Sequence, residues 1–461
     1  IIHYISFSSP GSSTWLCQAM ATADHLRAAL EADDRECLLR QCGQLDVNLT
    51  LTSNGYEATV AHHVASKPHG LDCLKRLVDK LGAACLTTEV DDGGDLPLHV
   101  AALRQDEKSM EFIRNSAGPE CFELTGQFNR TIVHMAAQNE HSSSALMWLV
   151  KQIGPDCLNV LDSDGNTPVH LAAWKQDEAS MRFIKEQLGT DCFVQRGEMQ
   201  RTAVHMSALN VASNSAFKWL VCECGPGSLT EKDTESNTPV HLAALRQGED
   251  SMQFINAQVG SQVFLIEGNN GGTSVNFAAE NCISKSALAW CARELDPKCL
   301  LVKDSFGRMP IHLAALHQDE HSMQLLVSSL GRDCLTLPGE MQRTAVHYAA
   351  LNSSSISALR WIVGQLGTDC LKLTDSEGSM ALHLAAQVQG VDSLSLILDS
   401  LGADAFKLEG LNGLRMAHYA AANSQKQELL AWIASEIGPD SLHEPDALGR
   451  TAIELAAEDD E

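Results

Sequence analysis

Residues 162–173 read Asp-Ser-Asp-Gly-Asn-Thr-Pro-Val-His-Leu-Ala-Ala, and the phrase that begins at Thr167 recurs along most of the chain. The fourth residue of the phrase falls at these positions: His62, His99, His134, His170, His205, His241, Asn276, His312, His347, His383, His418 and Glu454. After the first interval the positions are 35 and 36 residues apart in strict alternation, so every second copy lies 71 residues further on. A fixed period of this length indicates a stack of small repeated units.

The local chemistry of one copy predicts two short helices joined by a turn. Thr167 suits the N-cap of the first helix, and Pro168 suits its first position, where the missing N–H donor has no effect. A second helix is expected to start near Ser180 and to end at Gly189, because glycine is common where a helix stops in the left-handed conformation. Asp162-Ser-Asp-Gly then reads as a tight turn. We therefore expect helix, turn, helix and an extended turn in each unit.

The segment from Asp162 to Ala173 resembles the ankyrin-repeat signature, Asp-x-x-Gly-x-Thr-Pro-Leu-His-x-Ala-Ala, and the resemblance covers about residues 54–461. It implies an all-α fold with short β-turn fingers, an ankyrin-type helical-repeat solenoid. Each repeat of 35 or 36 residues would hold two helices, in a paired super-repeat of 71 residues. The family period is about 33 residues. The copies in this chain are longer, with one extra residue after each second helix.

The domain organisation follows from where the phrase begins. Residues 1–19 are expected to be an N-terminal extension, either upstream of a true start at Met20 or disordered. Residues 20–53 have a helical pattern without the phrase, so we expect a degenerate N-terminal capping repeat there. Residues 54–461 are expected to form the repeat array, with a partial last copy.

Composition limits the classes of function. The chain has 33 Lys and Arg against 59 Asp and Glu, and the net charge of −26 argues against a nucleic-acid partner. No apolar run approaches the roughly 18 residues of a spanning helix, so no membrane insertion is expected. The fifteen cysteines include no CxxC pair and follow no secretory signal. We expect a reducing, cytoplasmic setting, with bacterial secretion into a host cytosol as the alternative.

The motifs of common enzyme classes are missing from the sequence. We find no GxSxG, Walker A, GxGxxG, HExxH or kinase signature. Because repeats fill nearly the whole chain, we expect no enzymatic activity, no catalytic residues, no cofactor and no metal. The periodic histidines occur once per repeat, which is too far apart to share an ion. The resemblance implies instead that each of them makes hydrogen bonds that brace a turn.

Two further residue types follow the period. Six cysteines lie thirteen residues before a fourth position and are interpreted as small buried core residues: Cys121, Cys157, Cys192, Cys299, Cys334 and Cys370. Five of the seven tryptophans occupy one position of the second helix, at 71-residue intervals: Trp148, Trp219, Trp290, Trp361 and Trp432. We expect these tryptophans to contribute large buried areas to the core.

We therefore expect the function to depend on residues at the surface of the repeats. The resemblance implies that partners bind the concave face, which the turn tips and the ends of the first helices form. Five residues beyond the fourth position, Asn alternates with Arg, Lys or His: Arg104, Asn139, Lys175, Asn210, Arg246, Asn281, His317 and Asn352. The turns add three apolar residues, each with an arginine two positions on: Phe128 and Arg130, Met199 and Arg201, Met341 and Arg343. Met and Arg are enriched at protein interfaces, so we take all fourteen residues as candidate partner contacts.

Two interpretations of the alternating series stay open. In a groove, its cations and amides would hold an extended acidic peptide by charge-assisted hydrogen bonds. Alternatively, Asn caps the helix end locally, the cations offset the helix dipole, and internal duplication repeats both. We expect a monomeric, non-enzymatic scaffold that binds a protein or an extended acidic peptide. The alternative is an interaction module cut from a larger protein whose missing part has an enzymatic or channel activity.

Overall fold

In a computed structural model of the chain, the described residues are 25–42, 45, 49–53 and 56–458. The expected N-terminal extension, residues 1–19, lies outside them. The chain divides into two compact units, Ile1–Ser228 and Leu229–Glu461. Across the described ranges, no helix combines the length and the apolar character that a membrane crossing requires.

The first unit begins with structure that precedes the regular repeats. Residues 25–31 are helical, and helix α2 (Arg35–Cys42) follows them. An antiparallel hairpin then forms between β1 (Thr50–Ser53) and β2 (Tyr56–Thr59). The sequence analysis did not predict this hairpin. Its strands flank Asn-Gly in the sequence, the pair most favoured in two-residue hairpin turns.

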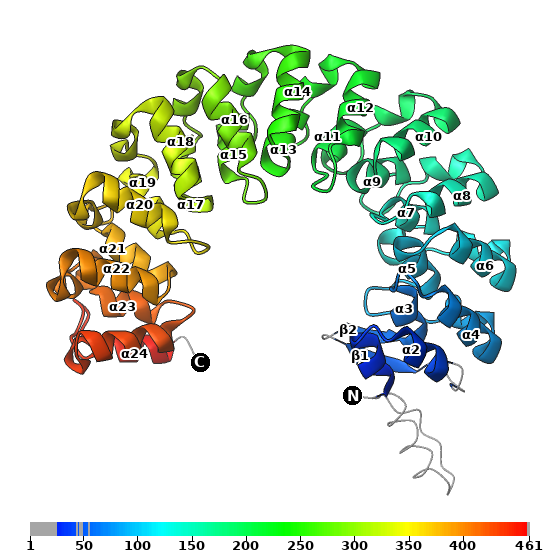
Figure 1. Cartoon of the computed structure of the whole chain (residues 1–461), viewed down its shortest axis with the longest axis horizontal. Coiled ribbons are helices and arrows are strands. Elements are labelled where there is room, and N and C mark those ends of the chain that lie inside the picture. The colour runs from blue at the N-terminus through cyan, green and yellow to red at the C-terminus, as the bar shows by residue number, and fades with distance from the viewer. Residues whose placement is uncertain (1–24, 43–44, 46–48, 54–55, 459–461) are drawn as a thin grey trace, which may run out of the picture. The chain divides into compact units, whose positions relative to one another are not determined.

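The rest of the first unit consists of paired helices. Their bounds are α3 (Val60–Ala65), α4 (Leu71–Leu81), α5 (Pro97–Arg104), α6 (Glu107–Ala117), α7 (Ile132–Ala137), α8 (Ser144–Ile153), α9 (Pro168–Lys175), α10 (Glu178–Leu188), α11 (Ala203–Ala208) and α12 (Ser215–Cys224). Odd-numbered helices from α3 to α11 are the first helices of their repeats and pack on one another. The second helices form another layer, in which α6 packs on α8 and α10 on α12, so the unit has two helical layers (Figure 1).

The second unit repeats this arrangement. Its helices are α13 (Pro239–Arg246), α14 (Glu249–Val259), α15 (Ser274–Glu280), α16 (Ser286–Glu294), α17 (Pro310–His317), α18 (Glu320–Leu330), α19 (Ala345–Ala350), α20 (Ser357–Leu366), α21 (Ala381–Val388), α22 (Val391–Leu401), α23 (Met416–Ala421), α24 (Lys426–Glu436) and α25 (Ala452–Glu458). First helices again pack on first helices, as α13 does on α15 and α15 on α17. The predicted all-α repeat solenoid is therefore confirmed in each unit.

One first helix shows why the phrase specifies this unit. Thr167 is the N-cap of α9 and Pro168 is its first residue, as predicted. Ala172 and Ala173 are fully buried, and their small side chains let neighbouring first helices approach closely.

The following second helix starts earlier than the sequence indicated. Helix α10 begins at Glu178 rather than near Ser180, because the Asp177 side chain accepts a hydrogen bond from the N–H of Ser180 and caps the helix. The helix ends at the expected Gly189, whose φ of 78° is left-handed.

A short 3-10 helix follows the second helices, and the sequence analysis did not predict it. These segments are η1 (Ala83–Leu86), η2 (Pro119–Glu123), η4 (Pro155–Asn159), η5 (Asp191–Phe193), η7 (Pro226–Thr230), η8 (Ser261–Leu265), η10 (Pro297–Leu301), η11 (Arg332–Thr336), η13 (Thr368–Lys372), η14 (Ala403–Lys407) and η16 (Pro439–Leu442). All six periodic cysteines lie in them and are at most 9% exposed. Their interpretation as small buried core residues is confirmed.

The periodic tryptophans pack against these 3-10 helices. Trp219 meets Phe193 edge-on at a centroid distance of 5.8 Å, and Trp290 lies 5.3 Å from Phe264. Both tryptophans are buried, whereas Trp148, Trp361 and Trp432 are only partly buried. The prediction that the periodic tryptophans are buried in the core is thus fully confirmed for two of the five.

Candidate functional site

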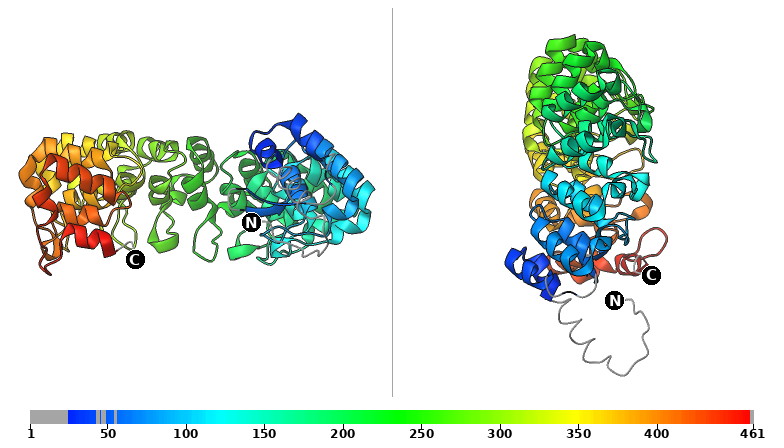
Figure 2. Two further views of the ribbon diagram at one scale, coloured as in Figure 1. Left: turned by 90° about the horizontal axis from the view of Figure 1, so that it is seen from below. Right: turned by 90° about the vertical axis from the view of Figure 1, so that its right-hand side faces the viewer.

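The predicted contact residues occupy two regions of the repeats. Arg104, Lys175, Arg246 and His317 are the last residues of α5, α9, α13 and α17. The four predicted asparagines follow the ends of α7, α11, α15 and α19. The remaining six residues lie in the fingers, by which we mean the loops that precede the first helices. In the second unit, the fingers of the green repeats extend from one side of the helices (Figure 2).

His170 shows what the periodic histidine does. Its Nδ1 accepts a hydrogen bond from the Thr167 N–H at 3.1 Å, and its Nε2 lies 3.1 Å from the Gln195 carbonyl oxygen in the next finger. An N–H only donates and a carbonyl only accepts, so the ring is neutral with its proton on Nε2. A Cβ added at Gly197 would come within 3.2 Å of this ring, so the finger needs glycine there. The bracing role that the resemblance implied is confirmed.

The brace depends on hydrogen bonding and on an uncharged side chain. Burial lowers the pKa to about 4 for His99, His241, His312 and His383. Asn276 occupies the same position and makes equivalent bonds: its Oδ1 accepts from the Thr273 N–H at 3.1 Å, and its Nδ2 donates to the Arg308 carbonyl at 3.4 Å. Among the described residues, no three His, Cys, Asp or Glu side chains are grouped to hold a metal ion.

The predicted asparagines are buried, and their side chains are hydrogen-bonded within the protein. Asn139 is 1% exposed, and its Nδ2 donates to the carbonyls of Ala102 at 3.1 Å and Gln105 at 2.8 Å. Its Oδ1 accepts from the N–H groups of His141 and Ser142. The other three are buried in the same position: Asn210, Asn281 and Asn352. The prediction that these four amides contact a partner is therefore wrong, because they cap the turn between helices, as the alternative interpretation had it.

Glutamines of the intervening repeats continue these bonds. Gln176 Nε2 donates to the Asn139 carbonyl at 3.3 Å, and Asn210 Nδ2 donates to the Gln176 carbonyl at 3.0 Å. In the second unit the same series runs through Asn281, Gln318, Asn352, Gln389 and Asn423. We call this series of side chain–backbone bonds the amide ladder. It places Gln and Asn in alternate repeats, which gives a physical reason for the 71-residue pair.

The basic residues stay at the surface, but they do not form a row of one charge. Glu140 lies between two of them, with Oε1 3.8 Å from Arg104 Nη1 and Oε2 3.8 Å from Lys175 Nζ. The three side chains are 32–45% exposed, so each pair contributes at most about 1 kcal/mol. Arg246 and His317 are exposed in the second unit, and neither forms an ion pair with any residue that the structure describes.

A polar hollow lies beside this charge cluster in the first unit. Its volume is about 300 Å³, and Lys175, Glu140, His141 and Asp177 line it together with the amide ladder. The second unit has a hollow of about 340 Å³ at the corresponding helix–helix connections, lined by serines and by Gln389. The ends of the first helices therefore border concave, polar surface in both units.

Alternate fingers end in a two-residue turn with left-handed backbone. The turn residues are Phe128-Asn129, Met199-Gln200, Asn270-Gly271, Met341-Gln342 and Asn412-Gly413, all with φ between 52° and 71°. Two successive positive φ values define the type I′ turn, which favours Asn-Gly. Two of the five fingers have that pair, and three carry a bulky apolar residue at its first position.

The apolar tips are strained and exposed. A non-glycine residue in the left-handed region costs about 1–2 kcal/mol, and Phe128 has φ 55° and ψ 28°. The side chains of Phe128 and Met341 are 47% and 40% exposed, so burial does not offset this strain. Met199 is half-buried. Because Asn270-Gly271 builds the same turn with residues that tolerate the left-handed region better, the fold does not require an apolar tip.

The arginines of the fingers position these tips. Arg130 Nε lies 2.9 Å from Asp162 Oδ2 of the next finger, and its guanidinium lies 5.0 Å from the Phe128 ring centroid. Arg343 pairs with Asp375 at 2.9 Å in the same way. These two arginine side chains are only 18% and 19% exposed. These arginines therefore hold the tips in position, and little of their charge is available to a partner. Arg201, at the equivalent position, is half-buried.

A full repeat thus joins a short first helix, a longer second helix and a finger that a buried histidine or, at Asn276, an amide braces. The chain has the ankyrin-repeat fold. No protein-family model matches its sequence. Among solved structures, the chain is similar to the ankyrin repeat domain of Bcl-3, a member of the IkappaB protein family. The similarity covers 51% of this chain and 99% of that one, with 19% identity and a TM-score of 0.36.

In this ankyrin array, further apolar side chains are exposed in fingers where none was predicted from the sequence, and Phe306 is one of them. Phe306 is 45% exposed in a finger of the other class, and the Arg308 guanidinium lies 4.9 Å from its ring centroid. The signal was available, because Phe306 and Arg308 share the spacing of Phe128 and Arg130. Glu140 was also missed. We call Phe128, Met199, Phe306 and Met341 the tip residues.

Proposed function

We propose that this ankyrin array is a non-enzymatic scaffold that binds a protein partner through the tip residues and the basic ends of the first helices. One observation carries the proposal: Phe128 is exposed and strained where Asn270-Gly271 of the same chain makes the turn with residues that tolerate the left-handed region better. Backbone strain persists where a function selects it. Exposed apolar side chains on a braced finger are suited to protein contact.

The charges indicate an extended partner segment that combines apolar and acidic side chains. Arg104, Lys175 and Arg246 are at the surface, at the ends of the first helices that are remote from the fingers. An incoming carboxylate would replace Glu140 as the partner of Arg104 and Lys175. At physiological salt the screening length is about 8 Å, so the net charge of −26 does not prevent a close contact of this kind. The proposed setting is the cytoplasm, since the described cysteines are unpaired thiols.

The test selects ligands on the native chain and then alters the tips. A phage-displayed peptide library is panned on the purified full-length chain, and the affinity of each enriched peptide is measured by fluorescence anisotropy. The tip variant carries Phe128→Asn, Met199→Asn and Met341→Asn. We expect acidic peptides with apolar residues to be enriched. They should bind the tip variant at least about tenfold more weakly, which corresponds to about 1.4 kcal/mol.

A matched control uses an apolar residue of similar exposure on a second helix. Ile153 is 43% exposed at the end of α8, and Ile153→Asn should leave peptide affinity unchanged. Peptides that bind the tip variant as tightly as the native chain, or that lose affinity with Ile153→Asn instead, would contradict the proposal.

A further inference from the structure

Two cysteines from different helices meet near the start of the first unit. Cys42 is the last residue of α2 and Cys73 lies in the first turn of α4; these helices pack on each other, and the two thiols are near enough for each to shift the pKa of the other. Cys42 is 0% exposed and Cys73 is 3% exposed. The sulfur atoms of a disulfide are about 2 Å apart. A bond of this kind would join two helices, α2 and α4, that already pack on each other.

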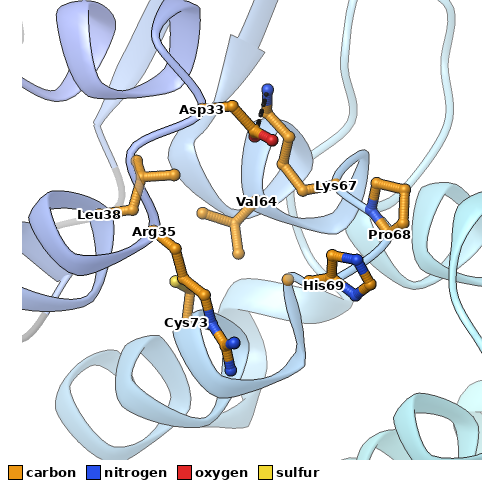
Figure 3. Close-up of a pocket in the computed structure, with 9 residues that line it drawn as sticks. Asp33, Arg35, Leu38, Val64, Lys67, Pro68, His69 and Cys73 are labelled. Atoms are coloured by element: carbon orange, nitrogen blue, oxygen red, sulfur yellow. Dashed lines mark ion pairs between the residues drawn. The ribbon is translucent and has the colours of Figure 1, made fainter.

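A small cavity leads to this pair. Its volume is about 70 Å³, and Cys73 lines it together with Leu38, Val64, Arg35 and Lys67. Figure 3 draws these side chains around the cavity, with the Lys67 ammonium turned to Asp33 and the Cys73 sulfur beside Arg35. One water molecule takes about 30 Å³ of liquid volume. The cavity therefore admits a molecule with two non-hydrogen atoms, such as hydrogen peroxide.

Cys73 is the more reactive thiol of the two. The hydrogen bond from Cys42 lowers the pKa of Cys73, and the guanidinium groups of Arg35 and Arg76 lower it further against the opposing effects of burial and Asp72. The same hydrogen bond, together with burial, raises the pKa of Cys42. The thiolate is the nucleophilic form of cysteine. Cys73 is thus suited to attack an oxidant, and Cys42 is placed to resolve the product.

The periodic cysteines differ from this pair. Burial raises the pKa of Cys121 to about 11 and that of Cys157 to about 12, so both remain thiols at neutral pH. Cys291 and Cys299 are near enough to affect each other electrostatically, but burial raises the pKa of both. The pKa of Cys73 is below the ordinary value, in contrast to these four.

We propose that Cys42 and Cys73 form a reversible disulfide, with a peroxide as the oxidant, and that this bond fastens α2 to α4. The Cys73 thiolate attacks one peroxide oxygen, the O–O bond breaks, and hydroxide leaves Cys73 as a sulfenic acid. The Cys42 sulfur then attacks the Cys73 sulfur, the S–O bond breaks, and the S–S bond forms. The Cys42 proton leaves with the departing oxygen as water. The thiols lose two electrons in total, and hydrogen peroxide is reduced to two water molecules.

The bond would fasten α2, which precedes the regular repeats, to α4, the second helix of the first regular repeat. Surface ion pairs hold α2 and the turn before it, Arg35 to Asp72 at 2.5 Å and Asp33 to Lys67 at 3.0 Å. Such pairs contribute little. A reducing thiol reverses the bond by disulfide exchange, so the attachment of α2 follows the redox state.

The experiment treats the full-length chain with hydrogen peroxide under native conditions. Remaining thiols are alkylated in denaturant, and the non-reduced peptides are identified by mass spectrometry. We expect a peptide pair joined through Cys42 and Cys73 that disappears after reduction with dithiothreitol. Cys73→Ser should abolish the linked pair. Cys42→Ser should leave Cys73 as a sulfenic acid that dimedone labels. The matched control, Cys85→Ser, removes a buried cysteine of η1 and should leave the linked pair in place.

Two exposed cysteines, Cys222 and Cys282, show whether the oxidant has acted on the protein. Their oxidation, with Cys42 and Cys73 recovered as free thiols in the same sample, would overturn the proposal. The linked pair is measured in the native chain, so a serine variant that fails to fold does not affect this outcome. Thermal melting of the oxidised and reduced forms gives a second measurement, in which we expect a higher first transition for the oxidised chain.

Discussion

The main-chain N–H of Ser163 donates a hydrogen bond to the carbonyl oxygen of Phe128 at 2.8 Å. Ser163 belongs to the finger of the following repeat, so the tip of one finger is bonded to the next finger. The same 2.8 Å bond joins Ser305 to Asn270 and Ser376 to Met341. The type I′ turn therefore forms whether its first residue is Phe, Asn or Met, because an N–H of the next finger donates a hydrogen bond to the carbonyl oxygen of that residue.

The first prediction concerns the strain at the tip. Replacing Phe128-Asn129 with Asn-Gly, the pair found at 270–271, should raise the free energy of unfolding by about 1 kcal/mol, because it removes a left-handed aromatic residue. Urea unfolding followed by circular dichroism measures the change. The reverse exchange at Asn270-Gly271 should lower stability by a similar amount. A stability loss in the Asn-Gly variant would show that the aromatic tip supports the fold.

The second prediction concerns pH. Burial lowers the pKa to about 4 for His99, His241, His312 and His383, whereas the unfolded chain has histidines near 6.5. Between these values the unfolded state binds more protons, so stability falls as pH drops from about 6.5 to about 4. Urea midpoints at several pH values in this window measure the slope. His312→Asn, which copies Asn276, should make the slope shallower, and an unchanged slope would contradict the assignment.

The third prediction concerns the amide ladder. Asn139→Ala removes bonds to the carbonyls of Ala102 and Gln105 and leaves these buried groups unpaired. A loss of about 2–4 kcal/mol is expected, since each unpaired buried polar group costs about 1–3 kcal/mol. Chemical unfolding gives the total, and hydrogen exchange should locate the loss in α5 to α8. The control Asn115→Ala, at an exposed position of α6, should change stability by less than about 0.5 kcal/mol.

The fourth prediction concerns the tryptophans. Trp219 is 7% exposed and packs on Phe193, so Trp219→Ala should destabilise the chain by roughly 3–5 kcal/mol. Trp361 is half-buried at the equivalent position, and its replacement by Ala should cost distinctly less. Denaturant midpoints of the two variants provide the comparison. A loss below about 1 kcal/mol for Trp219→Ala would mean that the indole contributes little to the core.

The fifth prediction concerns charge at the ends of the first helices. Reversing Arg104, Lys175 and Arg246 to Glu should abolish binding of the selected acidic peptides and leave the helical circular dichroism intact. Glu140→Gln should strengthen the same binding, because it removes the internal competitor of Arg104 and Lys175. Peptide titration at two salt concentrations measures both effects. Unchanged affinity in the charge-reversed variant would remove the basic residues from the proposed site.

Much of the fold was predictable because its signals are local. Thr167-Pro168 begins a helix and Gly189 ends one through backbone chemistry within a few residues. The predicted start of α10 was two residues too late, because the capping residue Asp177 was interpreted as part of the charged connection between the two helices. The periodic cysteines were predicted correctly, since their spacing follows the repeat.

The site was harder to predict because its contacts cross between repeats. An Asn at the end of a helix can face solvent or cap a neighbour, and the carbonyl that decides for Asn139 belongs to Ala102, 37 residues away. The left-handed tips carried no signal either, because Phe-Asn and Met-Gln are unusual in a type I′ turn. The backbone of the paired fingers imposes that conformation, and only the structure shows it.

The amide ladder also has a consequence for how such an array changes length. From Gln105 to Asn210 in the first unit and from Gln247 to Asn423 in the second, a Gln end meets an Asn end at every step, so deleting one repeat there would place two like ends together. Deleting 71 residues would preserve the alternation, whereas deleting 35 or 36 would break it. Insertions and losses in the history of this chain should therefore come in even numbers of repeats, and a shortened array made in the laboratory should obey the same parity.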